Sequence, residues 1–261
     1  MKRIKEFLGG FLHYKALLYE LVVRDIKVRY KRSFLGLLWT IVNPLLTMAV
    51  MTLVFSHLFR FEIENFTIYF LTANIMFTFF TESTTNGLHS IVDNGNLIKK
   101  VYIPKYLFPV SKVMSGVVNL FFSFIALIIM MIVTGSPFHL TMLLTPIVMI
   151  YLIMFSMGLA LILSAFMVFF RDIAQLYGIC TLLWMYLTPI FYPVSLLKDN
   201  APWALSINPM YYYIDYFRMI VLEGGVPSLR MNIICFLISF IVLLVGLVIF
   251  YKKQDRYILY I

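Results

Sequence analysis

Long apolar stretches separated by short polar segments are the dominant pattern along this chain. A helix needs about 20 residues to cross the roughly 30 Å of hydrocarbon in a membrane, and six stretches are long enough to do so. The pattern therefore predicts an all-α integral membrane protein with six transmembrane helices. The predicted spans are residues 35–58, 67–89, 108–134, 140–169, 174–194 and 231–251.

The stretch 195–230 is aromatic, but we do not count it as a span. Prolines and glycines interrupt it repeatedly, and both residue types break helices. Asn208 followed by Pro209 can start a half-helix whose N-terminus faces inward, which is a favourable position for anionic groups. Farther on, Asp215 and Arg218 are spaced i,i+3 and are candidates for an ion pair.

A basic segment precedes the first span. Leu18, Val22, Ile26 and Tyr30 recur at every fourth position, which predicts a helix with an apolar stripe over residues 14–33. Spacing also suggests the ion pairs Glu20–Arg24 and Asp25–Arg29. A basic amphipathic helix of this kind lies in the plane of the membrane surface. Anchorage to lipid alone and a docking role are both open for it. Its charged residues near the first span are Arg24, Asp25, Lys27, Arg29, Lys31 and Arg32.

Composition and charge agree with a membrane protein. Hydrophobic residues make up 62% of the chain and charged residues 13%, whereas soluble domains have about 45–50% and 25%. If the N-terminus is cytoplasmic, only Arg60, Lys198, Arg218 and Arg230 of the 21 Lys and Arg residues fall outside. The positive-inside rule then places both termini in the cytoplasm. The net charge of +9 is thus read as a topology signal, which argues against nucleic-acid binding.

This orientation divides the chain into three parts and places two notable loops inside. The parts are a cytoplasmic N-terminus (1–34), a transmembrane domain (35–254) and a cytoplasmic tail (255–261). The loop 90–107 contains GNLIKKVYIPK, which combines apolar and basic residues in a way that suits a short helix. The loop 169–176 is very short and holds Arg171–Asp172 as a polar turn. Arg171 as an ordinary positive-inside anchor is an alternative.

Motifs for catalysis or nucleotide binding are missing from the sequence. It contains no G-x-x-x-x-G-K-[ST], so any ATP must be bound by a partner. The four histidines are scattered without metal-ligand spacing, and no G-x-S-x-G or carboxylate pair is present. We therefore expect no catalytic residue, metal or cofactor in this chain.

Glu82 is an acid inside the second predicted span. An ionisable residue within a membrane is a functional hypothesis by default. The alternative is that Glu82 bonds to its Ser, Thr and Asn neighbours or reaches toward the inner surface. No other span offers a partner acid, which weakens the hypothesis of a proton-driven carrier.

Four segments resemble the type-2 ABC export permeases for polysaccharides, a family that includes the O-antigen (Wzm-like) and teichoic-acid exporters. They are RDIKVRYKRSFLGLLWTIVNPLL, LIKKVYIPKYLFPVSKV, FFRDI and TPIFYPVS…INPMYYYIDYFR, in that order from about residue 20 to the end. The resemblance implies a homodimer of six-helix subunits in the bacterial cytoplasmic membrane. It also implies two copies of a separate ATPase subunit, which holds ATP and Mg²⁺, and export of an undecaprenyl-diphosphate-linked polymer.

The resemblance also implies roles for parts of this chain. Residues 24–32 would form an interface helix, and residues 195–230 short helices acting as an exit gate in the outer leaflet. Contact with the ATPase would involve Asn96, Leu97, Ile98, Lys99, Lys100, Arg171 and Asp172. The family pattern does not provide a role for Glu82.

Aromatic residues near the outer ends of the spans fit a glycan cargo. Sugar rings present apolar C–H faces that pack on aromatic rings and allow a polymer to slide. An interfacial aromatic belt is the alternative for most of them. The candidates for a glycan path or gate there are Tyr186, Phe191, Tyr192, Tyr212, Tyr213, Tyr216 and Phe217, to which we add Trp39 near the inner start of the first span.

Other functions are less well supported by the sequence. A type-2 permease for a drug or another lipid would have the same architecture. A membrane-embedded glycan-modifying enzyme would need clustered acids or histidines at one membrane face, and a secondary carrier would predict inverted repeats. Neither feature is found.

Overall fold

A computed structural model describes residues 14–31, 33–55, 63 and 65–260, and these residues form helices and no strand. The all-α class predicted from the sequence is therefore confirmed. The longer elements are α2 (Lys15–Tyr30), α3 (Trp39–Val54), α4 (Phe66–Asp93), α6 (Leu107–Thr134), α7 (Thr145–Met167), α8 (Ile173–Tyr186), α11 (Pro209–Val221) and α12 (Leu229–Lys253). The shorter ones are η1 (Gly36–Leu38), α5 (Gly95–Lys100), η3 (Leu140–Leu144), α9 (Val194–Asn200), α10 (Pro202–Ile207), η4 (Gln254–Arg256) and α13 (Tyr257–Tyr260).

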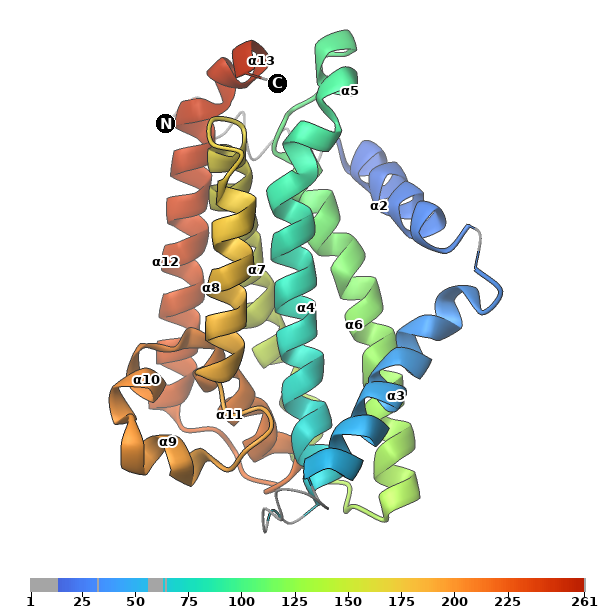
Figure 1. Cartoon of the computed structure of the whole chain (residues 1–261), viewed down its shortest axis with the longest axis vertical. Coiled ribbons are helices and arrows are strands. Elements are labelled where there is room, and N and C mark those ends of the chain that lie inside the picture. The colour runs from blue at the N-terminus through green and yellow to red at the C-terminus, as the bar shows by residue number, and fades with distance from the viewer. Residues whose placement is uncertain (1–13, 32, 56–62, 64, 261) are drawn as a thin grey trace.

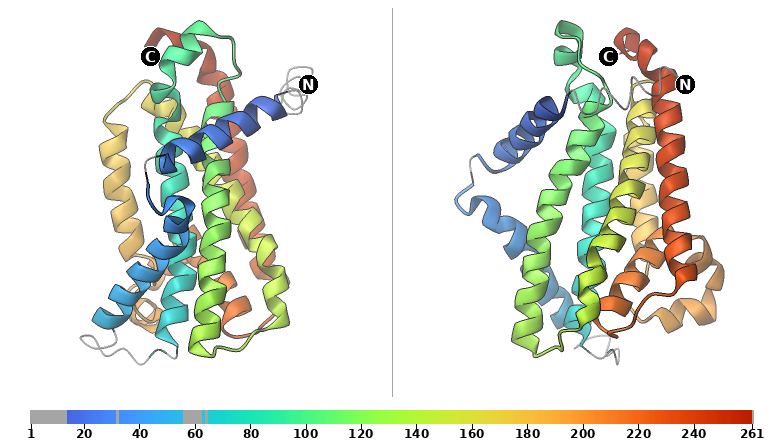
Figure 2. Two further views of the ribbon diagram at one scale, coloured as in Figure 1. Left: turned by 90° about the vertical axis from the view of Figure 1, so that its right-hand side faces the viewer. Right: turned by 180° about the vertical axis from the view of Figure 1, so that it is seen from behind.

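The core of the bundle is built from α4, α6, α7 and α12, which run side by side (Figures 1 and 2). Helices α7 and α12 approach each other closely at Gly158 and Gly246. A Cβ on Gly158 would lie 2.5 Å from the carbonyl oxygen of Val242, and one on Gly246 would collide with the main chain of Gly158. Small residues allow helix backbones in membranes to approach this closely, so the two glycines set the distance between the helices.

Length and apolar composition support four of the predicted spans. Within the described residues, the helices long and apolar enough to cross a membrane are Gly36–Val54, Leu107–Thr134, Leu140–Met167 and Leu229–Tyr260. Helix α4 runs the length of the bundle (Figure 1) but carries many polar side chains, and α8 has only 14 residues. The count of six spans therefore stays a prediction.

The two ends of the bundle differ in structure. Helices α5 and α13, the start of α2 and the turn between α7 and α8 lie at one end (Figure 1). Helices α9, α10 and α11 lie at the other end, where the broken stretch 195–230 forms short helices. Helix α2 crosses the outside of the bundle obliquely and packs against α6 (Figure 2).

Helix α11 begins at Pro209, as the sequence predicts, and Asn208 is its cap. The Asn208 side chain accepts hydrogen bonds from the main-chain N–H of Met210 (3.0 Å) and from the indole N–H of Trp184 (2.6 Å). Its amide donates to the Thr188 hydroxyl at 2.8 Å. The cap therefore also joins α11 to α8 and to the segment that follows α8.

Arg218 is a second residue that attaches α11 to the rest of the bundle. It is 4% exposed and donates to the main-chain carbonyls of Pro189 (2.8 Å) and Tyr69 (3.0 Å). Its guanidinium also lies 3.4 Å from the centre of the Tyr69 ring. The suggested ion pair with Asp215 is not among the ion pairs of the described residues, because the guanidinium is committed to main-chain carbonyls.

Candidate functional site: a polar cavity between four helices

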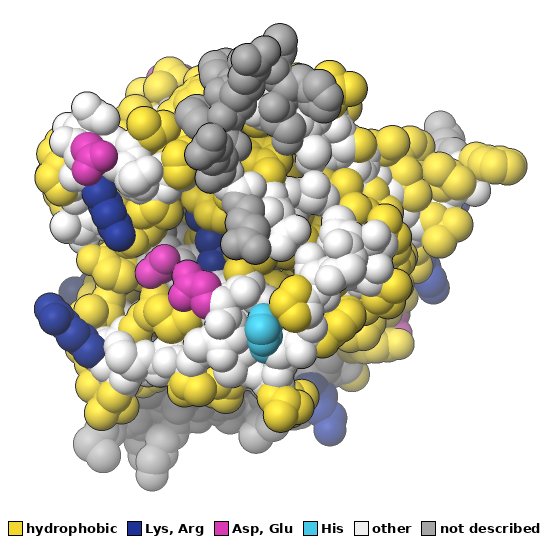
Figure 3. Space-filling model, turned by 90° about the horizontal axis from the view of Figure 1, so that it is seen from below, with side chains coloured by type: hydrophobic (Ala, Val, Ile, Leu, Met, Phe, Trp, Pro, Cys, Tyr) yellow, Lys and Arg dark blue, Asp and Glu magenta, His cyan; other side chains and the backbone are white. Residues whose placement is uncertain are grey.

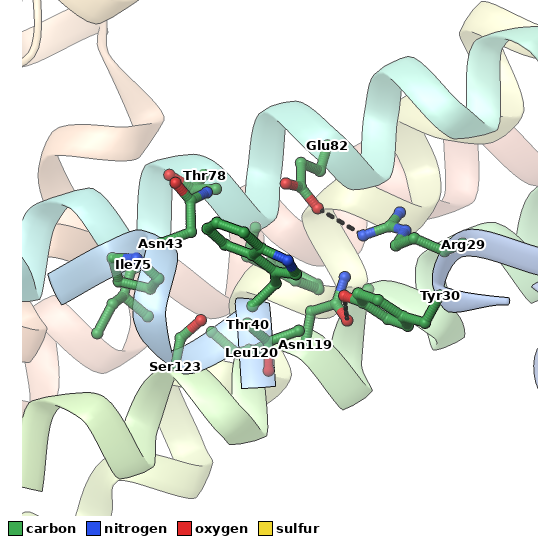
Figure 4. Close-up of a pocket in the computed structure, with 14 residues that line it drawn as sticks. Arg29, Tyr30, Thr40, Asn43, Ile75, Thr78, Glu82, Asn119, Leu120 and Ser123 are labelled. Atoms are coloured by element: carbon green, nitrogen blue, oxygen red, sulfur yellow. Dashed lines mark hydrogen bonds and ion pairs between the residues drawn. The ribbon is translucent and has the colours of Figure 1, made fainter. Parts of the chain in front are cut away.

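A cavity of about 310 Å³ lies between α2, α3, α4 and α6. Figure 4 shows Glu82 and Thr78 of α4 on one side, and Asn119 and Ser123 of α6 on the other. The residues that line it are Arg29, Tyr30, Trp39, Thr40, Asn43, Pro44, Ile75, Thr78, Phe79, Glu82, Gly116, Asn119, Leu120 and Ser123. Polar groups thus gather inside a bundle whose helices are otherwise mostly apolar.

Helical spacing explains why these polar residues share one space. Thr78 and Glu82 on α4 are four residues apart, as are Asn119 and Ser123 on α6, so each pair lies on one face of its helix. Both rows continue toward the end of the bundle that holds α5, because a second cavity of about 190 Å³ is lined by Asn86, Ser115 and Asn119. We call these two cavities and their lining the polar seam.

An ion pair closes one side of the cavity. Arg29 Nη1 lies 3.1 Å from Glu82 Oε2, and both side chains are only partly covered, at 37% and 42% exposed. A pair this accessible to water contributes about 0.2–1 kcal/mol. Nearby, the Tyr30 hydroxyl donates to Asn119 Oδ1 at 3.4 Å. Burial raises the pKa of Tyr30 above its ordinary value, because it disfavours the charged phenolate.

The charged residues of α2 connect it to other helices. Asp25 forms an ion pair with Lys112 of α6 at 3.0 Å and accepts a hydrogen bond from its neighbour Arg24 at 3.1 Å. Arg24 also donates to Asn94, just beyond α4, at 3.3 Å. The predicted pairs Glu20–Arg24 and Asp25–Arg29 are therefore wrong: Arg24 pairs with its neighbour Asp25, and Arg29 pairs with Glu82 of α4.

The helical nature of α2 is confirmed, and the four residues of its predicted apolar stripe, Leu18, Val22, Ile26 and Tyr30, are all partly buried. Leu21 is its buried residue, and Leu17 and Leu18 pack beside it. Tyr19 and Val28 are 66% and 70% exposed, so apolar side chains are spread around the helix. Of its other predicted charged residues, Lys27 and Lys31 are exposed, and Arg32 lies outside the described residues.

The predicted contact residues for an ATPase lie together at one end of the bundle. The sequence predicted a short helix in the loop 90–107, and α5 is that helix. Asn96, Lys99 and Lys100 are exposed there, Leu97 is partly buried, and Ile98 is buried against the bundle. Two further residues, Arg171 and Asp172, are exposed in the turn between α7 and α8, at the same end (Figure 1).

The tail supports α5 through Lys105. Its ammonium group donates to the main-chain carbonyl of Gln254 at 2.6 Å and lies 5.9 Å from the ring centre of Tyr257. Burial lowers the pKa of Lys105, opposed by the charge of Asp255. Tyr257 and Ile98 belong to one buried cluster, so the C-terminal helix and α5 pack as a unit.

The predicted path or gate residues fall into three groups by burial. Tyr213, Tyr216 and Phe217 are fully buried, and the hydroxyls of the two tyrosines bond to Ser239 (2.6 Å) and Asn232 (2.9 Å) of α12. In this conformation they hold α11 against the bundle. Partly buried candidates are Phe191, Tyr192 and Tyr212, whereas Trp39 and Tyr186 are 42% and 60% exposed.

The end that carries α9–α11 is hollowed beside acidic side chains (Figure 3). A cavity of about 450 Å³ there is lined by Asn65, Tyr69, Pro193 and Glu223, among others. Large areas around the hollow are hydrophobic or uncharged (Figure 3). Exposed basic residues are also present at this end, namely Lys198 in the last turn of α9 and Arg230 at the start of α12.

The sequence indicates Glu82 and Trp39 as candidate functional residues, but it does not predict the cavity that both line. The available signal was the four-residue spacing of polar positions in TFFTESTTN and of Ser115, Asn119 and Ser123 within a highly apolar span. Only the packing of α4 against α6, with α2 and α3 alongside, shows that both rows face the same space.

Relatives with similar length cover nearly the whole chain. An O-antigen export system permease protein RfbA of Klebsiella pneumoniae is 32% identical over 235 residues, or 90% of each chain. The RfbA protein of Myxococcus xanthus is 30% identical over 94% of this chain and 95% of its own. The capsule polysaccharide export inner-membrane protein CtrC of Neisseria meningitidis is 22% identical over 93% of each.

A family model described as ABC-2 type transporter matches residues 16–222, which include α2 through α11. This match confirms the resemblance drawn from the four sequence segments. The chain therefore belongs to the ABC-2 type transporter family, and it is a transporter subunit rather than an enzyme.

Proposed function

We propose that this chain is the membrane permease subunit of an ATP-driven exporter for a lipid-linked cell-envelope polysaccharide. The cargo would be an O-antigen or teichoic-acid type polymer on undecaprenyl diphosphate. The observation that carries the proposal is the polar seam. Polar groups facing lipid are costly and are tolerated where they line a water-filled or substrate space. The names of the relatives support polysaccharide as the cargo.

The membrane arrangement that we propose has six spans, formed by α3, α4, α6, α7, α8 and α12. Both termini lie in the cytoplasm of a bacterium, and α9–α11 enter the outer leaflet as a gate. The location of Lys99, Lys100, Lys252 and Lys253 at one end of the bundle supports this orientation. A reporter after Ile261 should read cytoplasmic and one near Asp199 external; the same side for both would contradict the arrangement.

The partners in this proposal are two ATPase subunits and a second copy of the permease. Each ATPase would contact α5 and the turn at Arg171–Asp172, and would bind the ATP and Mg²⁺. A second copy can cover the apolar face of α8, where Leu176, Ile179 and Leu183 are exposed. ATP binding would push the cytoplasmic loops together and open a path between the two permease copies.

Deletion of this chain in its host tests the function. Surface polysaccharide should disappear, while the undecaprenyl-diphosphate-linked polymer accumulates on the cytoplasmic side, and the intact gene should restore export. Unchanged surface polysaccharide together with a new drug sensitivity would refute the proposal and indicate the alternative drug permease. The purified chain should show ATPase activity only when the separate ATPase subunit is bound to it.

A further inference from the structure

We propose that the 310 Å³ cavity of the polar seam binds a neutral sugar residue of the transported glycan, not its diphosphate. The inference rests on the proposed function and adds the part of the substrate that is recognised. Four features of the cavity carry it: its charge balance, its available polar groups, its aromatic wall and its size.

The charge balance favours an uncharged ligand. Arg29 and Glu82 are the charged side chains among the residues that line this cavity, and they pair with each other at 3.1 Å. A diphosphate entering the cavity would meet the carboxylate of Glu82 and would have to compete for Arg29. Sugar hydroxyls can instead donate to the carboxylate and accept from the guanidinium, which leaves the pair intact.

Three helices contribute polar side chains that are available to such a ligand. Among the described residues, the side chains of Asn43, Thr78 and Ser123 make no hydrogen bond to protein, although all three line the cavity. Asn43 and Thr78 are exposed to the space (Figure 4). Adjacent hydroxyls on one sugar ring can satisfy amide and hydroxyl groups that converge from several directions.

The remaining wall supplies an apolar contact. Trp39 lines the same cavity and its side chain is 42% exposed. The C–H face of a sugar ring can pack on an indole, which has a large apolar surface and a polar N–H at its edge. The volume of about 310 Å³ lies at the lower end of the range for small-molecule sites, which suits one or two sugar rings.

A matched pair of threonines on α4 provides the test. Thr78 lines the cavity with an available hydroxyl, whereas Thr81, outside the cavity, donates to the Phe77 carbonyl at 3.0 Å. Thr78→Val should weaken sugar binding about two- to tenfold, the loss expected for one hydrogen bond, and Thr81→Val should not. Trp39→Leu should abolish binding, whereas Trp39→Phe should retain part of it because a ring face remains.

Binding is measured by saturation-transfer NMR on the wild-type permease and on each variant, each with its ATPase in lipid nanodiscs. The probes are methyl glycosides of hexoses, deoxyhexoses and N-acetylhexosamines, with inorganic pyrophosphate as competitor. We expect at least one glycoside to bind, with the pattern of the variants above, and pyrophosphate not to displace it. Displacement by pyrophosphate, or equal binding to all variants, would overturn the inference. If gene deletion abolishes export but no glycoside binds, the exporter assignment stands and this inference is wrong.

Discussion

Replacing Arg218, whose guanidinium is buried, tests most directly which contacts hold α11 in the bundle. Replacing Arg218 with Met removes two hydrogen bonds, to the carbonyls of Pro189 and Tyr69, and the stacking contact with the Tyr69 ring. These contacts join α11 to the start of α4 and to the segment after α8. We therefore expect α11 to open from the bundle more readily in this variant.

The contacts allow an estimate of the size of the effect. A hydrogen bond from a charged group contributes about 1.5–3 kcal/mol, and a desolvated cation–π contact about 2 kcal/mol. The gross loss on removing Arg218 is therefore roughly 5–8 kcal/mol, and relief of the desolvation penalty of the buried charge returns several kcal/mol. We expect a net loss of about 3 kcal/mol, within the usual range for a disrupted buried network.

Cys235 provides the assay, because it is fully buried on α12 in the same core cluster as much of α11. In a Cys180→Ser background it should react slowly with maleimide. A loss of about 3 kcal/mol in the opening free energy should speed this reaction about 100-fold. Arg218→Lys should show an intermediate increase, because an ammonium lacks the planar fork that reaches both carbonyls.

Arg230 provides the matched control, since it is exposed at the start of α12. Arg230→Met should label like the parent protein. If Arg218→Met also labels at the parent rate and unfolds at the same temperature, Arg218 does not fasten α11. The estimate from its contacts would then be refuted.

Two further predictions concern helix packing and the partner surface. Gly246→Val should destabilise the protein by about 3 kcal/mol or more, because its side chain would meet the main chain of Gly158; Gly178→Ala, with open space around it, is the control in thermal unfolding of the purified protein. Reversing the exposed charges at Lys99 and Lys100 should weaken co-purification with the ATPase at low salt, and the difference from the wild type should shrink at high salt, which screens exposed charges. Undiminished association at low salt would show that α5 is not part of that interface.

Local sequence pattern was enough to predict most helices of this protein. The apolar stretches behind α3, α6, α7 and α12 are long and uninterrupted, so their helical state follows from the need to satisfy main-chain groups within lipid. Pro209 with its Asn208 cap likewise marked the start of α11. These features depend on neighbours in the sequence, which is why they are readable without a structure.

The bonding partners of the charged side chains could not be predicted from the sequence in this way. The sequence suggested Asp215 for Arg218 and Asp25 for Arg29, in each case the acid one turn away. The structure pairs Arg218 with main-chain carbonyls and Arg29 with Glu82, which is 53 positions along the chain. Spacing along one helix limits the possible partners, but a charged side chain bonds to whichever group the packing of other helices brings nearest.

The sequence by itself therefore determined the membrane class, the apolar helices and the family. The tertiary structure decided that the polar rows of α4 and α6 face each other, and that Trp39 and Glu82 line one cavity with them. It also decided that Tyr213 and Phe217 are buried in the core. Helix formation is driven by local main-chain bonding and by the membrane, whereas a site of this kind exists only where separate helix faces converge.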